Sequence, residues 1–290
     1  MNDSLRLPVR PRDAHKGDLG RLVLVAGSRR WAGAAVLAAE GAQRAGVGLA
    51  TLAAPGAALV RLGALDPGVM VVALASTREG TLGEAGLRAL RVAVRGADAV
   101  AVGPGLGRDP AMRDLLTRAL RDFPGAVVVD ADALDAFAGA PEELAALGAR
   151  RFLTPHPGEA ARLLGCTVAD VAADREGTAL ELARRSEGIA ILKGPRTVVA
   201  DPTGAVTLGP EGDPVLARGG SGDVLTGVLG ALAARGLDPR LAARVAVAAH
   251  ARAGERLAAR EGRAGPGPRD LAAEIGRVLG ELEGAEGDAS

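Results

Sequence analysis

The chain has 290 residues, and its 35 basic and 35 acidic side chains cancel, which gives no argument for binding nucleic acid or an anionic membrane surface. Only three Phe, one Trp and no Tyr are present, so bases have few rings on which to stack. A single cysteine, Cys166, excludes an internal disulfide and a site of several cysteines, and it suits a reducing compartment.

No targeting or membrane segment is predicted. The N-terminal stretch Met1–Arg6 lacks the apolar region of a secretory signal. The longest uncharged run, Ala45–Val60, is too short to span a bilayer and contains Pro55. We therefore expect a cytoplasmic protein without a membrane partner.

Short apolar runs alternate with helical patterns along much of the chain. After a polar turn at Ala14–Gly20, a first strand ends in Gly27. Further strands are predicted at Val47–Ala53, Val69–Leu74, Ala97–Val102, Ala126–Asp132, before Thr154 and at Gly188–Leu192, with helices at Gly33–Ala45, Leu82–Val94 and Pro110–Arg121. Because the strands are continuous apolar runs, both faces of their sheet should be covered by helices. The pattern predicts a doubly wound, mainly parallel α/β sheet.

The unusual residues of the chain follow these strands. They are Gly27 and Ser28, Gly103–Gly107, Asp130 and Asp132, Thr154–Glu159, and Lys193–Thr197. In an open parallel sheet, ligands bind beyond the carboxyl ends of the strands, so this clustering predicts an active site there. No Walker A sequence occurs, and Gly103–Gly107 lacks the spacing of a dinucleotide fingerprint, so we interpret it as a loop that a ligand approaches closely.

The second part of the chain no longer alternates between strand and helix patterns. Thr197–Ala200 and Ala205–Leu208 flank the turn Asp201–Gly204 and predict a hairpin. Helices are expected to about Ala259 and over 271–282, with a frayed polar tail from about residue 283. Because the sequence contains no domain linker and no internal repeat, we expect one domain over residues 1–290.

The glycine-rich stretch Leu216–Gly227 carries the strongest local signal. Its glycines permit a tight turn from which an apolar helix begins, and a helix N-terminus with bare amides binds anions. Asp223 lies in the first turn of that helix. It either acts on a ligand, as a base or a contact to a hydroxyl, or merely complements the helix dipole.

Two strand ends carry further candidates. His156 lies between two prolines and either contacts a ligand or belongs to a well-made helix start with Glu159. Lys193, before an unobstructed turn, suits a nucleotide phosphate, with a solvated charge before a hairpin as the alternative.

The remaining candidates have structural interpretations. Asp130 and Asp132 either hold a metal or position a ligand, although capping of the following helix is the favoured role of Asp132. His250 lies on a largely apolar helix and is interpreted as a packing residue.

Taken together, these segments resemble the ADP-dependent NAD(P)H-hydrate dehydratases from about residue 14 to residue 260. The motifs occur in the family's order: Lys16–Gly20, Gly33–Ala39, Arg44–Gly48, Val102–Gly107, Val129–Leu134, Leu153–Glu159, Leu192–Gly194 and Gly219–Gly227. The resemblance implies a ribokinase-like three-layer α/β/α fold. It also implies a lyase that restores NADH and NADPH from their S-form hydrates, with ADP converted to AMP and phosphate.

The same resemblance implies roles for single residues. Asp223 would be the catalytic base and, with Ala34, Gly105 and His156, would bind the hydrated cofactor. The adenine nucleotide, ADP or ATP, would lie against Lys193, Gly194, Pro195, Arg196, Thr197, Gly220, Ser221 and Gly222. Mg²⁺ is expected with the phosphates, its protein ligands undetermined, and a homotetramer is expected.

One departure and two alternatives accompany this resemblance. Family members commonly carry Asn-Pro-Gly where this chain has Asp213-Pro214-Val215, which bears on phosphate geometry and on the choice between ADP and ATP. A kinase of the same fold, acting on a thiazole or another vitamin-precursor alcohol, would use the same glycine-rich turn. A non-catalytic nucleotide-binding protein is the third reading.

Overall fold

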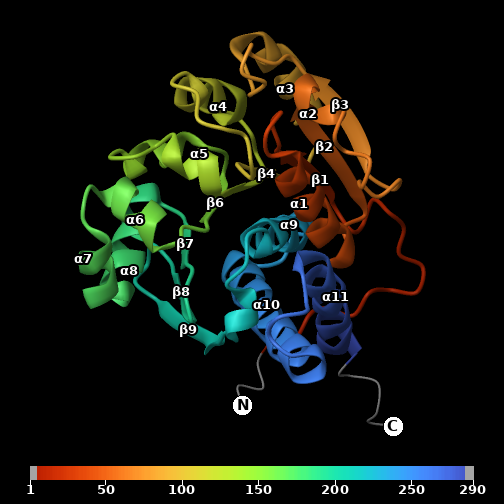
Figure 1. Cartoon of the computed structure of the whole chain (residues 1–290), viewed down its shortest axis with the longest axis vertical. Helices are drawn as coiled ribbons and strands as arrows, with labels where there is room; N and C mark the ends of the chain where they lie inside the picture. The colour runs from red at the N-terminus through yellow and green to blue at the C-terminus, as the bar shows by residue number, and fades with distance from the viewer. Residues whose placement is uncertain (1–4, 285–290) are drawn as a thin grey trace.

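The computed structural model describes residues 5–284; most of the N-terminal stretch considered above and the end of the polar tail lie outside this range. Within it, nine strands form one sheet with helices on both faces (Figure 1). The strands are β1 (Arg21–Val25), β2 (Leu49–Pro55), β3 (Met70–Leu74), β4 (Ala99–Val102), β5 (Ala126–Val129), β6 (Arg150–Leu153), β7 (Ile189–Leu192), β8 (Arg196–Ala200) and β9 (Val206–Glu211).

The helices connect successive strands of the parallel part and then cover the sheet. They are α1 (Ala32–Arg44), α2 (Gly56–Leu59), α3 (Leu87–Ala93), α4 (Met112–Leu120), α5 (Ala131–Asp135), α6 (Pro157–Leu164), α7 (Val168–Ala173), α8 (Arg175–Ser186), α9 (Ser221–Ala234), α10 (Pro239–Glu261) and α11 (Pro268–Gly284). Short 3₁₀ turns are η1 (Glu84–Gly86), η2 (Pro141–Ala146) and η3 (Pro214–Leu216).

The strand order is β3-β2-β1-β4-β5-β6-β7-β8-β9. Strands β1 to β7 pair in parallel, whereas β8 pairs antiparallel with both β7 and β9. The chain runs outward from β1 to β3 and then returns to place β4 on the other side of β1. This reversal creates a topological switch point between β1 and β4, where open α/β sheets bind ligands.

Alternate residues of the central strands enter two separate cores. Leu22 and Leu24 of β1 pack under α1, α9, α10 and α11, while Val23 and Val25 pack on the opposite side under α3, α4, α6 and α8. Burial of both faces explains the continuous apolar runs of these strands. The predicted three-layer α/β/α fold with a mainly parallel sheet is confirmed.

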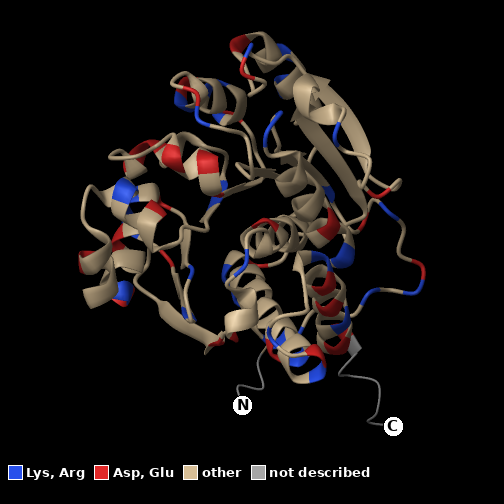
Figure 2. Cartoon of the chain, in the orientation of Figure 1, with Lys and Arg blue, Asp and Glu red and all other residues tan. Residues whose placement is uncertain are grey.

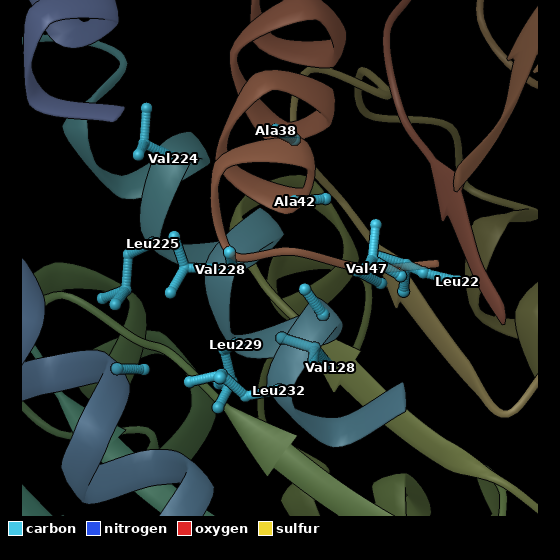
Figure 3. Close-up of a cluster of buried hydrophobic side chains, with 14 of the residues drawn as sticks. Leu22, Ala38, Ala42, Val47, Val128, Val224, Leu225, Val228, Leu229 and Leu232 are labelled. Carbon is cyan, nitrogen blue, oxygen red and sulfur yellow. The ribbon is translucent and has the colours of Figure 1, made fainter. Parts of the chain in front are cut away.

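Helices α1 and α9 approach each other unusually closely because glycines lie in their contact. A Cβ atom on Gly41 would lie 2.4 Å from the carbonyl oxygen of Val224, and one on Gly227 would lie 1.9 Å from that of Ala38. Figure 3 shows the side chains of Val224, Leu225, Val228 and Leu229 of α9 in one apolar cluster with Ala38 and Ala42 of α1. This contact holds α9, and with it the glycine-rich turn, at a fixed height above the sheet.

Three predicted elements differ from the structure. The helix predicted at Leu82–Val94 begins only at Leu87, because Leu82 forms an isolated bridge with Ser76 and η1 intervenes. Strand β5 ends at Val129, so Asp132 belongs to α5 and not to a strand. Glu283, where fraying was predicted to begin, lies in α11 and pairs with Arg235.

The other elements lie within a few residues of their predicted positions, including the hairpin of β8 and β9. In the described range no helix is long and apolar enough to cross a membrane. Figure 2 shows positions of Lys and Arg interspersed with those of Asp and Glu along the elements. One domain over residues 1–290 stays a prediction.

Candidate active site

The loops after β1 and β4 meet at the switch point. The N–H of Gly27 donates to the carbonyl of Pro104 at 2.8 Å. Gly105 has φ +63°, and a Cβ atom there would lie 2.6 Å from the carbonyl oxygen of Trp31 and 3.0 Å from the Cβ of Ala34. Glycine is therefore required at this contact, and two predicted substrate residues, Ala34 and Gly105, lie side by side.

The glycine-rich turn forms the N-terminus of α9. Gly220 precedes the helix with φ +100°, a conformation that favours glycine, and Ser221 begins the helix. The first N–H groups of a helix lack intrahelical acceptors and carry partial positive charge, so they attract an anion. Asp223 lies in this first turn, as predicted.

Lys193, directly after β7, connects three other elements to this turn. Its Nζ atom lies 2.8 Å from Oδ1 of Asp130, after β5, and 3.8 Å from a carboxylate oxygen of Glu159 in α6. A Cβ atom on Gly222 would lie 3.5 Å from the same Nζ. The ammonium group thus faces the N-terminus of α9, and its interpretation as a solvated charge is wrong.

Asp130 is held on both sides. One carboxylate oxygen binds Lys193, and the other accepts a hydrogen bond of 2.6 Å from the hydroxyl of Thr226 in α9. Asp130 is buried, so these two partners compensate for the loss of water around its charge. The result is a rigid link from β5 and β7 to the second turn of α9.

Burial shifts the acidity of the carboxyl groups around Lys193. Burial, reinforced by the neighbouring charge of Asp130, raises the pKa of Asp223 to about 7. Burial likewise raises the pKa of Glu159 to about 7, against the opposing effect of Lys193. Asp223 is therefore poised to take or release a proton near neutral pH, as a general base requires.

His156 forms the N-cap of α6. Its Nδ1 atom accepts hydrogen bonds from the N–H groups of Gly158 and Glu159 at 3.0 and 3.3 Å, and the Glu159 carboxylate accepts one from the His156 N–H at 2.7 Å. The helix-start interpretation is thus confirmed. Burial lowers the pKa of His156, and since Nδ1 accepts, the neutral ring carries its proton on Nε2. The Nε2 atom lies 3.4 Å from Oε1 of Glu159, and half of the side chain stays exposed.

The segment Lys193–Thr197 is supported by an arginine that sequence reasoning missed. One Nη atom of Arg175 donates to the carbonyls of Leu192, Lys193 and Arg196 at 3.1 to 3.3 Å. The N–H of Lys193 donates to the carbonyl of Pro155, which joins this segment to the loop before His156. The predicted nucleotide-binding residues 193–197 thus form a turn beside α9 that Arg175 holds in place.

Three interpretations from the sequence change with the structure. Asp132 caps no helix; its carboxylate accepts the N–H of Gly107 at 2.8 Å. His250 does more than pack, because its Nε2 lies 3.0 Å from the carbonyl oxygen of Ser221, where α9 begins. Asp213 points to Arg263, which it binds at 3.1 Å, so this departure from the family pattern places no free charge on the phosphate turn.

No group of three or more His, Cys, Asp or Glu side chains within residues 5–284 is arranged to hold a metal ion. The chemistry of the site still suits Mg²⁺, which binds through one or two carboxylates, water and substrate phosphates rather than a complete protein cage. Of the carboxylates beside the proposed phosphate turn, Asp130 already binds Lys193 and Thr226, and Glu159 binds the His156 N–H.

Comparisons with known proteins agree with this geometry. Residues 22–277 match the family described as NAD(P)H-hydrate dehydratase. The chain is 41% identical to the bifunctional NAD(P)H-hydrate repair enzyme Nnr of Moorella thermoacetica over 96% of its length, but it spans only 52% of that relative. It is 38% identical to the ADP-dependent (S)-NAD(P)H-hydrate dehydratase of Xanthomonas campestris, with 95% of this chain and 94% of the relative covered.

A solved structure gives the same result. The ADP/ATP-dependent NAD(P)H-hydrate dehydratase of Bacillus subtilis, co-crystallised with ATP and Mg²⁺, superposes with a TM-score of 0.83 at 30% identity, covering 96% of this chain and 95% of that one. The family resemblance drawn from the ordered motifs is confirmed, whereas the ligand contacts of the single residues stay predictions. The chain belongs to the NAD(P)H-hydrate dehydratase family.

Proposed function

We propose that this chain is an ADP-dependent dehydratase, a hydro-lyase that restores NADH and NADPH from their S-form hydrates and converts ADP to AMP and phosphate. The observation that carries the proposal is the position of Asp223. A carboxyl group with a pKa of about 7 lies in the first turn of α9, beside bare amides and the ammonium group of Lys193. Base and anion site are thus within one turn of helix.

The reaction follows from this arrangement in two stages. Asp223 takes the proton from the added hydroxyl while its oxygen attacks the terminal phosphorus of ADP, and the bond to AMP breaks. The amides of Gly220 and Gly222 would stabilise the charge on the transferred phosphoryl group, whereas the Ser221 N–H donates to the carbonyl of Arg218. In the second stage the carbon–oxygen bond breaks, phosphate leaves with the electron pair, and a neighbouring ring carbon loses a proton to solvent, which restores the double bond.

Ligand positions are part of the same proposal. Ala34, Gly105 and the Nε2–H of His156 would contact the hydrated cofactor, and the turn from Lys193 to Thr197 would contact the adenine nucleotide. Mg²⁺ would accompany the phosphates and supply additional positive charge there. A homotetramer in the cytoplasm completes the proposal; light scattering would test the oligomeric state.

The deciding experiment is an absorbance assay with hydrated NADH or NADPH, Mg²⁺ and either ADP or ATP. We expect recovery of the dihydronicotinamide absorbance with equivalent release of inorganic phosphate. The donor that supports recovery identifies the preferred nucleotide. No recovery by folded protein would refute the dehydratase and direct the assay to small alcohols as kinase substrates.

We expect kcat/KM for the hydrate to fall as the pH drops through about 7. The pKa of Asp223 is raised to about 7, so the basic form exists above that pH and is lost below it. Glu159 also has a pKa of about 7, so the profile is to be repeated with Glu159→Gln. That variant removes a negative charge near Asp223 and should move the acid limb to lower pH. If kcat/KM did not fall through pH 7 in the wild type, and Glu159→Gln gave the same pH profile as the wild type, the assignment of Asp223 would be contradicted.

Replacing Lys193 by Ala should raise the KM for the nucleotide more than the KM for the hydrate. The variant removes the cation beside the proposed phosphate turn and leaves the buried Asp130 without its ionic partner, with only the hydroxyl of Thr226 bound to it. The unpaired charge should destabilise the protein by about 3–5 kcal/mol. The double variant Lys193→Ala with Asp130→Asn removes this charge and serves as the control for stability. An equal rise of both KM values in the double variant would show that Lys193 is not a nucleotide ligand.

A further inference from the structure

A cavity of about 360 Å³ opens beside the site described above. Its lining includes Arg108, Asp109, Asp132, Asp135 and Arg162, which come from the loop after β4, from α5 and from α6. The volume lies near the lower end of the range for small-molecule sites. Of its lining residues only Asp132 belongs to a motif of the chain, and the steps of the proposed reaction use none of them.

The cavity adjoins the proposed substrate site at three points. Asp132, in its wall, accepts the N–H of Gly107 and is one of the charges that raise the pKa of Asp223. A Cβ atom on Gly158 would lie 2.9 Å from the ring of His156 and 3.5 Å from the guanidinium of Arg162. A ligand that contacts the glycine loop and His156 therefore has this cavity directly next to it.

Two arginines of the wall are held by one carboxylate. Asp135, largely buried, accepts hydrogen bonds from Nη2 of Arg108 at 2.6 Å and from Nε of Arg162 at 2.7 Å. The trio carries a net charge of plus one, and the carboxyl groups of Asp109 and Asp132, the latter with a pKa raised by burial, complete the charged lining. Among residues 5–284, each of these guanidiniums binds Asp135 alone, and both side chains are substantially exposed. Each retains several N–H donors that Asp135 does not use, and guanidinium donors of this kind recognise phosphate oxygens.

We propose that Arg108 and Arg162 bind a phosphate group of the hydrated dinucleotide, so that this cavity holds the half of the substrate away from the reacting ring. The inference rests on the proposed function for the identity of the ligand. Binding energy from a remote part of a substrate positions the reacting ring for catalysis. The bridging pyrophosphate and the 2′-phosphate of NADPH share this chemistry, and substrates with and without the 2′-phosphate distinguish them.

The kinetic test compares Arg108→Gln and Arg162→Gln with the wild type. At saturating ADP, we expect kcat/KM for the hydrates to fall about ten- to a hundredfold, as for loss of hydrogen bonds to a charged group. The KM for ADP should stay unchanged. Arg113→Gln is the matched control, because its guanidinium donates to the carbonyls of Ala136 and Ala138 nearby and does not line the cavity. A selective loss confined to the cavity arginines supports the proposal, and wild-type kcat/KM in both variants overturns it.

A binding test separates this inference from the proposed function. Titration calorimetry with NAD⁺ and NADP⁺ needs no turnover. Equal weakening of both ligands in the variants identifies the pyrophosphate as the bound group, and weakening of NADP⁺ alone identifies the 2′-phosphate. Unchanged binding, or a wild type that binds neither dinucleotide, overturns the inference. A wild type that binds both without dehydrating the hydrates would instead refute the proposed function and leave the arginine site standing.

Discussion

Replacing Asp223 by Asn should reduce turnover by about 10³-fold, within the usual contribution of a general base, while the adenine nucleotide still binds. Asn keeps the size of the side chain but cannot take the proton of the hydroxyl group. The amides of α9 and the ammonium of Lys193 remain in place, so the anion site is preserved. Steady-state kinetics and calorimetric titration with ADP measure the two effects separately.

Asp132→Asn is the matched control for Asp223→Asn. Asp132 lies close enough to raise the pKa of Asp223, but its carboxylate binds the N–H of Gly107. An Asn at this position can still accept that hydrogen bond, so we expect a much smaller change in turnover. A wild-type rate in Asp223→Asn would refute the role of Asp223. If Asp223→Asn also stopped binding ADP, loss of the base could not be separated from loss of the site.

Asp223→Asn should also change the stability of the folded protein, by an amount that depends on pH. In the folded state the pKa of Asp223 is raised from 3.8 to about 7, so the native protein holds a proton that the unfolded chain releases. The stabilisation associated with this proton is present below pH 4 and is lost as the pH rises toward 7. We expect the melting temperature of Asp223→Asn relative to the wild type to increase over that interval and to level off above it.

Replacing Gly227 by Ala should destabilise the protein by about 3 kcal/mol or more, at the upper end of the effects of overpacking. The added Cβ would lie 1.9 Å from the carbonyl oxygen of Ala38, which is backbone and cannot rotate away. Helix α1 would have to move away from α9 along their whole contact, and the turn at Gly220–Asp223 would move with it. Denaturant unfolding measures the loss of stability.

Gly280→Ala is the control for an alanine placed in a helix. Gly280 is exposed in α11, and a Cβ atom there would meet nothing within 4 Å. The variant should gain up to about 1 kcal/mol, because Ala has the higher helix propensity. A Gly227→Ala protein as stable as Gly280→Ala would show that α1 and α9 can separate freely, contrary to the close contact described here.

Local patterns in the sequence determined the secondary structure and the order of the motifs. Apolar runs such as Ala126–Val129 predicted buried parallel strands because burial on both faces leaves no alternation of polar residues. Glycines before an apolar helix predicted the turn at Gly220, since only a backbone without a side chain easily adopts φ +100°. The ordered motifs were sufficient to identify the family.

The tertiary structure decided which of these residues act together. Lys193 and Asp130 are 63 positions apart, and nothing in their local sequence indicated their ion pair. His250 looked like a packing residue until α10 placed it against Ser221. The shift in the pKa of Asp223 arises from burial and from carboxylates after β5 and in α5 and α6. Periodicity and turn chemistry act between neighbours in sequence, whereas burial and electrostatic coupling exist only once distant segments have closed around the site.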